Sequence, residues 1–216
     1  MRFDLIVVPR GAEARAVERG WPAPRPEIRQ VAAGIAAGDG VIDGRLTPTV
    51  LVLGLCGAVD PVLRVGDAVV YARICDGSDT IELDAQLTRA CAAACGTVPV
   101  AAACVDRVIG GVAAKAALRA ATGAAVIDME AAAIARACRD RGVRLGMVRI
   151  VSDDADSELP DLSGVYDAQG ALRPVALAAA LVRRPLRGVR FVRNALRALG
   201  ELRAAAAVLA NAPSSW

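Results

Sequence analysis

Two acidic residues interrupt an apolar run in the middle of the chain. Every residue from Ala125 to Ala135 is apolar except Asp128 and Glu130. An ionised carboxylate in apolar surroundings is unfavourable unless something pairs with it. Carboxyl groups at these positions therefore indicate a site that uses them, and the chemistry open to them is proton transfer or hydrogen-bond acceptance.

A second acidic group follows further along the chain, with Asp153 lying 23 residues after Glu130. The apolar run from Leu145 to Val151, broken only by Arg149, ends in Ser152, Asp153 and Asp154. Two acidic groups that each follow a predicted buried strand suggest one shared site. The alternative is that the second group only caps a turn, where Ser and Asp are favoured.

The chain contains no histidine. Ser-His-Asp, Cys-His and ordinary His-containing zinc sites are therefore excluded. Acid–base chemistry falls to Asp, Glu, Cys, Tyr or the single lysine, Lys115. We expect no metal and no organic cofactor.

Length and composition favour a single α/β domain over residues 1–216. Apolar residues make up 55% of the chain but aromatic residues only 3%, which argues against an aromatic groove for nucleic acid. The six cysteines lie in apolar or Ala-rich surroundings without a CxxC pair, so we expect them to be reduced in a cytoplasmic protein.

Strand and helix patterns alternate along the chain, which predicts an α/β fold, a three-layer α/β/α sandwich with a mixed central sheet. The predicted strands are Phe3 to Val8, Thr49 to Gly54, Ala68 to Ala72, Val98 to Cys104, Ala124 to Ile127 and Leu145 to Val151. The predicted helices are Ala12 to Arg19, Ala85 to Ala94, Val112 to Ala121 and Ala131 to Arg141. Ligands of such sheets gather at strand ends, where Glu13, Gly54, Asp128, Glu130 and Asp153 are expected.

Three segments resemble the nucleoside phosphorylase and nucleosidase superfamily, whose members cleave the bond between a purine and its ribose. They are VIDMEAAAIA, VRIVSDDAD and VLVLGLCGAVDPVLRVGDAVV. Within it the chain is most similar to the hopanoid-associated phosphorylases, through GAEARAVERG, KAALRAATGAAVIDMEAAAIAR, SDDADSELP and the Arg-rich tail.

The resemblance implies roles for the acidic groups. Asp153 would donate a proton to N7 of the departing base, with Ser152 orienting it. Glu130 would accept hydrogen bonds from the ribose hydroxyls while Met129 packs against the sugar, and Asp128 is a weaker second candidate. The alternative for Glu130 is an interaction with a helix dipole alone.

The resemblance also implies the surroundings of the reacting bond. Glu13 matches the glutamate that positions the attacking water in hydrolytic members, although it could equally be a first-turn helix acid. Val108 and Ile109 match the stretch that grips the purine, although a turn at the end of a strand explains them equally well. Phosphate, as a possible co-substrate, would be bound by Gly54, Cys56, Gly57 and Arg15. The match to the phosphate loop is incomplete, since Leu55 replaces a serine and Val52 an arginine.

Together these features imply an enzyme that releases adenine from a 5′-substituted adenosine by phosphorolysis or hydrolysis. The most specific expectation is adenosylhopane, in hopanoid synthesis. One alternative is a nucleosidase of methylthioadenosine or S-adenosylhomocysteine, and another is a catalytically inactive nucleoside-binding or membrane-associated scaffold. The relatives also imply a homo-oligomer.

The C-terminal segment predicts a basic amphipathic helix over about residues 186–208. Residues 173–216 carry a net charge of +7, and the rest of the chain −4. Arg187, Arg190, Arg193 and Arg197 fall on one helical face, opposite Val189, Val192, Leu196, Leu199 and Leu202. Such a helix packs on the sheet with a solvated basic face, or binds an anionic membrane surface. The expected location is cytoplasmic, with peripheral contact at the inner membrane as the second interpretation.

Overall fold

The computed structural model describes residues 2–32, 34–39, 41–42, 48–162, 164–165 and 173–212. Its strands are β1 (Leu5–Pro9), β2 (Glu27–Val31), β3 (Thr49–Ala58), β4 (Ala68–Asp76), β5 (Asp79–Glu82), β6 (Pro99–Cys104), β7 (Val126–Asp128) and β8 (Arg144–Asp153). Its helices are α1 (Ala12–Gly20), the 3-10 helix η1 (Ile35–Gly38), α2 (Ala85–Cys95), α3 (Val112–Thr122), α4 (Ala131–Arg139), α5 (Pro174–Arg183) and α6 (Pro185–Asn211).

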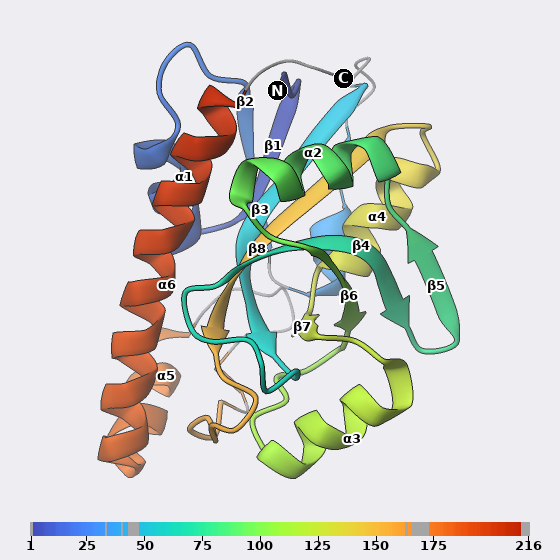
Figure 1. Cartoon of the computed structure of the whole chain (residues 1–216). Coiled ribbons are helices and arrows are strands. Elements are labelled where there is room, and N and C mark those ends of the chain that lie inside the picture. Colours follow the sequence, from blue (N-terminus) through green and yellow to red (C-terminus); the bar gives the residue numbers. More distant parts are fainter. Residues whose placement is uncertain are drawn as a thin grey trace.

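The strands form one mixed sheet, in which β3 and β8 are the long central pair (Figure 1). β3 runs parallel to β1 and β8, whereas β8 runs antiparallel to β4. Pairing continues from β4 to β6, from β6 to β7, and from β7 back to the end of β3, so that the sheet closes on itself there. This closure brings the ends of β3, β7 and β8 together, although β7 is distant from β3 in the sequence.

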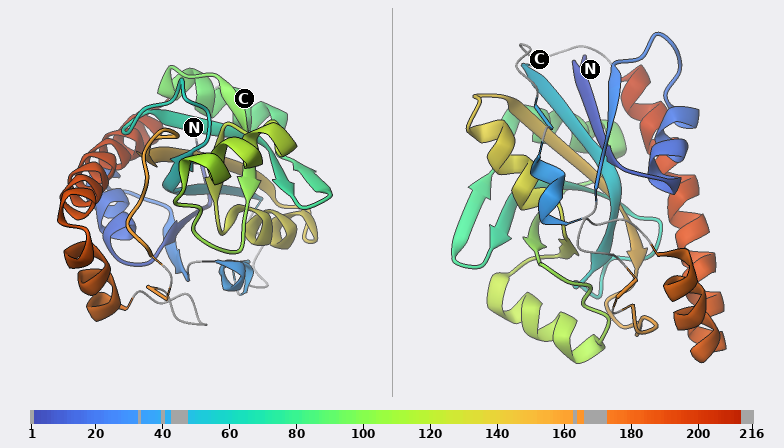
Figure 2. Two further views of the ribbon diagram at one scale, coloured as in Figure 1. Left: turned by 90° about the horizontal axis from the view of Figure 1, so that it is seen from below. Right: turned by 180° about the vertical axis from the view of Figure 1, so that it is seen from behind.

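Helices cover both faces of the sheet, which confirms the predicted α/β architecture. Helices α1, α2 and α6 pack on one face, through residues such as Val17, Leu87 and Leu202 (Figures 1 and 2). On the other face α4 packs beside η1, and Ile134 is fully buried there. Helix α3 lies across the end of the sheet below β6 and β7.

Several elements differ from the sequence prediction. Strands β2 and β5, which lie at the sheet edges, were not predicted because their residues are largely polar or exposed. Strand β3 continues four residues beyond the predicted end at Gly54, since its pairing with β8 and β7 extends to Ala58. Helix α4 ends at Arg139, two residues earlier than predicted, and Gly142 closes the turn with a positive φ.

Helix α6 is longer than predicted and is only partly covered. Its C-terminal half packs on the sheet through Ala198, Leu202, Ala205 and Leu209. In its N-terminal half the apolar residues of the predicted face are instead exposed, Val189 to 69% and Val192 to 42%. The expectation that this apolar face packs on the sheet therefore holds for the C-terminal half alone. Within the described residues, no helix combines the length and apolarity needed to cross a membrane.

Candidate active site

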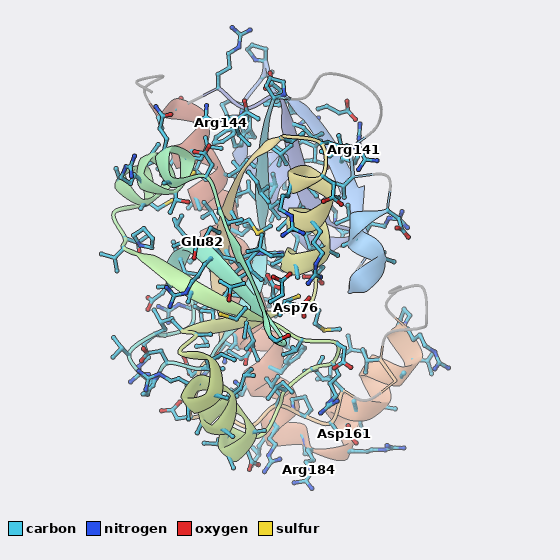
Figure 3. All side chains as sticks on the ribbon, turned by 90° about the vertical axis from the view of Figure 1, so that its right-hand side faces the viewer. Asp76, Glu82, Arg141, Arg144, Asp161 and Arg184 are labelled. Carbon is cyan, nitrogen blue, oxygen red and sulfur yellow. The ribbon has the colours of Figure 1, made fainter. Side chains whose placement is uncertain are left out.

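Most charged side chains lie at the surface, as Glu82, Arg141 and Arg184 do in Figure 3. A small set is buried instead. In the part of the chain that the structure describes, the buried charged residues are Lys115, Asp128, Glu130, Arg149 and Asp153. They come from α3, the β7–α4 junction and β8, and all of them lie around the place where the sheet closes. Burying so many charges together is unfavourable unless they pair, so this cluster marks the functional candidate.

A pocket of about 210 Å³ opens beside this cluster. Its walls carry Glu13, Asp128, Met129, Glu130, Ser152 and Asp153, together with Pro9, Leu55, Cys56, Gly57, Val105, Arg107, Val108, Ile109, Ile127, Leu159, Leu162, Phe191 and Ala195. The predicted acidic residues, which come from three distant parts of the chain, therefore share one cavity.

Arg149 holds the acidic side of the pocket together. It is fully buried, and its Nη2 lies 3.4 Å from Oδ2 of Asp128 and 3.6 Å from Oε2 of Glu130. Asp128 also accepts a hydrogen bond from the backbone N–H of Ala131 at the start of α4 (3.1 Å), and Glu130 one from that of Gly34 (3.3 Å). Burial raises the pKa of Glu130, and Arg149 partly offsets that effect.

Gly54 provides the space that Arg149 occupies. The two residues are direct neighbours across the β3–β8 pairing. A Cβ atom at position 54 would lie 2.1 Å from Nη1 of Arg149 and 2.8 Å from Oε2 of Glu13. A side chain here would therefore displace both charged groups. The glycine predicted for a phosphate loop is explained by this close approach.

We predict that Gly54→Ala lowers the free energy of unfolding by about 1–3 kcal/mol, because the added methyl group overpacks a buried site. Gly146→Ala on the neighbouring strand is the matched control, since a Cβ there would meet only atoms at 3.6 Å or more. Urea denaturation of the two variants measures the difference. Equal destabilisation would contradict the assigned role of Gly54.

Glu13 lies near the same guanidinium group, on the other side of the space at Gly54 that a Cβ would fill. It lies in the first turn of α1, and its Oε2 accepts a hydrogen bond from the backbone N–H of Leu55 (2.8 Å). Burial raises the pKa of Glu13 to about 7, while Arg149 acts in the opposite direction. A carboxyl group with this pKa can serve as a base near neutral pH.

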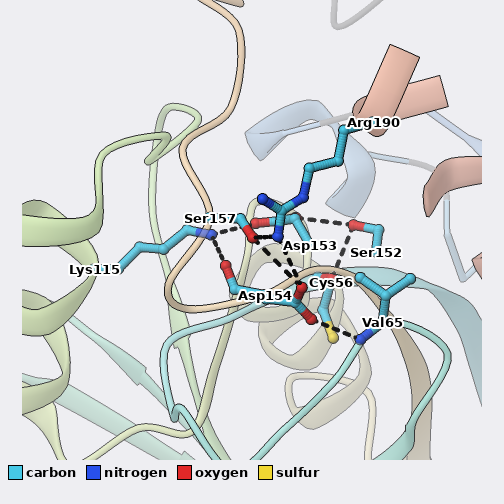
Figure 4. Close-up of polar contacts among 8 residues, drawn as sticks. All are labelled: Cys56, Val65, Lys115, Ser152, Asp153, Asp154, Ser157 and Arg190. Atoms are coloured by element: carbon cyan, nitrogen blue, oxygen red, sulfur yellow. Dashed lines mark hydrogen bonds and ion pairs between the residues drawn. The ribbon is translucent and has the colours of Figure 1, made fainter. Parts of the chain in front are cut away.

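Asp153 is the last residue of β8 and lines the pocket. Its Oδ2 lies 2.5 Å from Nζ of Lys115, and its Oδ1 lies 3.0 Å from Oγ of Ser152 (Figure 4). Gly57 makes room for this carboxyl group, because a Cβ there would lie 3.0 Å from Oδ2. Burial raises the pKa of Asp153, and Lys115 partly lowers it. The arrangement can hold a proton on a carboxyl group in the wall of the pocket.

A family model for the phosphorylase superfamily matches residues 30–183. The chain belongs to this superfamily. The predicted resemblance to nucleoside phosphorylases and nucleosidases is thereby confirmed at the level of the superfamily. Among curated proteins, none matches the sequence significantly.

Several solved structures have the same fold as this chain. A methylthioadenosine/S-adenosylhomocysteine nucleosidase from Neisseria meningitidis, in complex with methylthio-immucillin-A, superposes with a TM-score of 0.70 at 15% identity, covering 95% of this chain and 97% of the other. The corresponding Helicobacter pylori nucleosidase gives 0.67 at 15% identity, covering 92% and 93%. The futalosine hydrolase of Helicobacter pylori gives 0.60 at 16% identity, covering 89% and 96%.

The site residues predicted from the sequence fall into two groups, those that line the pocket and those that do not. All the predicted acid, sugar and base residues line the pocket, as do Cys56 and Gly57. Arg15 does not line the pocket, because it lies on the exposed side of α1. Gly54 lies beneath the pocket and faces Arg149. The geometry therefore gives no support to the predicted phosphate contacts of Arg15 and Gly54.

Sequence reasoning assigned no role to two residues that the structure places at the site. Arg149 pairs with two acidic residues, and Lys115 pairs with Asp153. The sequence carried a signal for Arg149, since it is the one charged residue in an apolar strand. For Lys115 the sequence carried no signal except that it is the single lysine. Its burial depends on how α3 packs, which only the tertiary structure shows.

Proposed function

We propose that this chain is an N-glycosidase that releases adenine from a 5′-substituted adenosine. The observation that supports this proposal is that two kinds of group line one pocket. Asp153 lies beside Gly57 and can protonate the departing base. Glu13 and Glu130 can bind the sugar and the attacking nucleophile, and Glu13 lies beside Gly54, three residues earlier on β3. Cleavage of a glycosidic bond needs these two functions on opposite sides of the scissile bond.

The charges around the proposed sugar-binding residues favour water over phosphate as the nucleophile. Arg149 supplies one positive charge, while Asp128 and Glu130 lie within 3.6 Å of it and Glu13 lies close by. A phosphate dianion would enter a buried site already rich in negative charge, which is unfavourable. Arg149 is fully buried and does not line the pocket, so its charge acts on Asp128 and Glu130 and is not presented to an anion in the cavity. We therefore favour hydrolysis, with Glu13 as the base.

The test is adenine release from three nucleosides, 5′-methylthioadenosine, S-adenosylhomocysteine and adenosylhopane, each with and without inorganic phosphate. We expect release without phosphate, with a 5-substituted ribose that carries a free anomeric hydroxyl as the second product. Formation of a 5-substituted ribose 1-phosphate only when phosphate is present would contradict the hydrolytic mechanism and support phosphorolysis. If none of the three nucleosides yields adenine, the alternative of a nucleoside-binding scaffold is supported instead.

We predict that kcat/KM rises as the pH increases through about 7, because Glu13 acts as a base only when ionised and its pKa is raised to about 7. Glu13→Gln should abolish this acidic limb and lower the rate by roughly a hundredfold. Glu18→Gln, on the same helix and outside the pocket, is the control. The pH dependence of adenine release from 5′-methylthioadenosine or adenosylhopane measures both effects. An acidic limb retained in Glu13→Gln would exclude Glu13 as its origin.

The 5′ substituent is the finer part of the proposal. Leu159, Leu162, Phe191 and Ala195 supply an apolar wall to the pocket. Phe191 and Ala195 belong to α6, whose other side carries an exposed apolar groove with a lining that includes Leu181, Val189 and Leu196. An apolar wall next to an apolar surface suits a hydrophobic substituent, and this supports adenosylhopane. The fold shared with methylthioadenosine/S-adenosylhomocysteine nucleosidases supports the smaller substrates equally, and the three-nucleoside comparison distinguishes them.

We also propose that the α5–α6 surface binds an anionic membrane. Val175, Val182, Leu186 and Val189 are between 69% and 87% exposed on it. The surface lies within the Arg-rich tail, so its charge is complementary to anionic lipids. A lipid-linked nucleoside would be reached from this side.

Co-sedimentation with vesicles tests this surface. We expect binding to phosphatidylglycerol-containing vesicles but not to phosphatidylcholine vesicles, and loss of binding in a Leu186→Asp/Val189→Asp variant. Val62→Asp, at an exposed apolar residue outside α5 and α6, is the control. If the double variant instead converts a dimer into a monomer in light scattering without any vesicle binding in the unaltered chain, a second copy covers the surface and the expected homo-oligomer forms there.

A further inference from the structure

Lys115 is a fully buried lysine on an otherwise largely exposed helix. It is the buried residue of α3, and its side chain has no exposed surface. A lysine is rarely buried unless its ammonium group is paired. Here Nζ lies 2.5 Å from Oδ2 of Asp153 and donates a hydrogen bond to the backbone carbonyl of Asp154 (2.7 Å). Both contacts end at the last residues of β8 and the loop that follows it, where the proposed acid lies.

Lys115 acts from behind Asp153. Asp153 and Ser152 line the pocket, whereas Lys115 does not. In Figure 4, Lys115 reaches Asp153 from α3, and Ser152 contacts it from the opposite side. With one carboxyl oxygen held by Lys115 and the other beside Ser152, the carboxyl group has a defined orientation towards the cavity. Lys115 therefore touches the proposed acid without being able to touch a bound nucleoside.

The groups around Asp153 come from each element packed against it. Lys115 comes from α3, Ser152 from the end of β8, and Asp154 from the residue directly after β8. Cys56 comes from β3, and burial raises the pKa of its thiol. Arg190 of α6 lies 3.5 Å from Oδ2 of Asp154, and that carboxylate also accepts a hydrogen bond from the backbone N–H of Val65 (2.9 Å). Among these groups the ammonium of Lys115 is the positive charge in direct contact with Asp153.

We propose that Lys115 is a positioning residue that orients Asp153 and sets the pH range in which Asp153 can give its proton to the base. This inference rests on the proposed function. When Asp153 donates its proton to N7, the glycosidic C–N bond breaks, its electron pair leaves with adenine, and a carboxylate remains in a buried site. The adjacent ammonium stabilises that carboxylate and so makes Asp153 a stronger acid.

Lys115 should shift the pH dependence of kcat/KM in a predictable direction. Asp153 must be protonated to act, so the rate falls as the pH rises through its pKa. Lys115 lowers that pKa and burial raises it. Removing the ammonium should therefore move the alkaline limb of kcat/KM to higher pH while weakening the acid. Protonated Asp153 would persist to higher pH but transfer its proton more slowly.

The first experiment compares Lys115→Met with the unaltered chain and with Arg119→Met, a control on the same helix whose partner is Asp60 at the surface. Adenine release is measured from adenosylhopane and 5′-methylthioadenosine between pH 5 and 10. For Lys115→Met we expect kcat to fall roughly tenfold to a hundredfold, KM to change less than threefold, and the alkaline limb to move up by about one pH unit or more. A folded Lys115→Met with an unshifted limb would overturn the inference.

A second measurement does not require a Lys115 variant to fold. Because Lys115 is the single lysine, ¹³Cε-labelled lysine gives one side-chain NMR signal. In the unaltered chain this signal should shift at the pH of the alkaline limb, and in Asp153→Asn that step should be lost. A signal that titrates identically in both proteins would overturn the pairing. Absence of adenine release from the unaltered chain would instead contradict the proposed function, which separates the two failures.

Discussion

Asp153→Asn should lower kcat for adenine release by about 10²- to 10⁴-fold at neutral pH, the contribution of a positioned general acid. Asparagine preserves the shape of the side chain and can still hydrogen-bond to the base, but it has no proton to donate. KM should change little, because the sugar contacts of Glu130 remain. The measurement is a continuous assay of adenine release, with the nucleoside that the unaltered chain cleaves fastest.

The matched control for this prediction is Asp156→Asn. Asp156 lies three residues further along, is exposed, and does not line the pocket. The same change of one carboxylate to an amide should leave its rate within twofold of the unaltered chain. Asp153→Asn also leaves the Lys115 ammonium beside a neutral partner, so thermal unfolding must show that the assayed protein is folded. A folded Asp153→Asn with an undiminished rate would exclude Asp153 as the acid.

Arg149→Met should have the largest effect on stability. Its removal leaves Asp128 and Glu130 buried without their cationic partner, and breaking a buried pair in this way typically costs about 3–5 kcal/mol. Activity should fall as well, since the carboxylates that bind the sugar lose their fixed orientation. Arg144→Met on the same strand is the control, because its ion pair with Asp84 is partly exposed and such pairs contribute about 1 kcal/mol or less.

The destabilisation caused by Arg149→Met should be smaller at low pH than at high pH. Burial raises the pKa of Glu13 from 4.5 to about 7 and also raises that of Glu130, so their neutral forms are favoured on folding. The contribution of these two groups to stability is therefore greatest below about 4.5 and decreases as the pH rises towards 7. Without Arg149 both pKa values rise further, and the difference from the unaltered chain should shrink at low pH. Urea denaturation at pH 5 and pH 8 measures this, and a difference that grows at pH 5 would contradict it.

Local patterns predicted most of the elements and most of the acidic site. Apolar runs that end in carboxylates predicted β7 and β8, and Asp128, Glu130 and Asp153 do share a pocket. These predictions succeeded because buried strands and carboxylates at their ends are both local features of the chain. The edge strands β2 and β5 were missed because their polar residues carry no such pattern. The N-terminal half of α6 was misjudged because a helical wheel shows which residues share a face but not what covers that face.

By itself, the order of residues determined the α/β class, the superfamily and the acidic residues of the pocket, since hydrophobic periodicity and short motifs are properties of neighbouring positions. Only the tertiary structure decided the partners of those acids. The pairing of Gly54 with Arg149 depends on the register between β3 and β8. The contact of Lys115 with Asp153 depends on how α3 crosses the end of the sheet. Both involve residues far apart along the chain, and the strength of a buried charge pair depends on distance and burial, which no local pattern encodes.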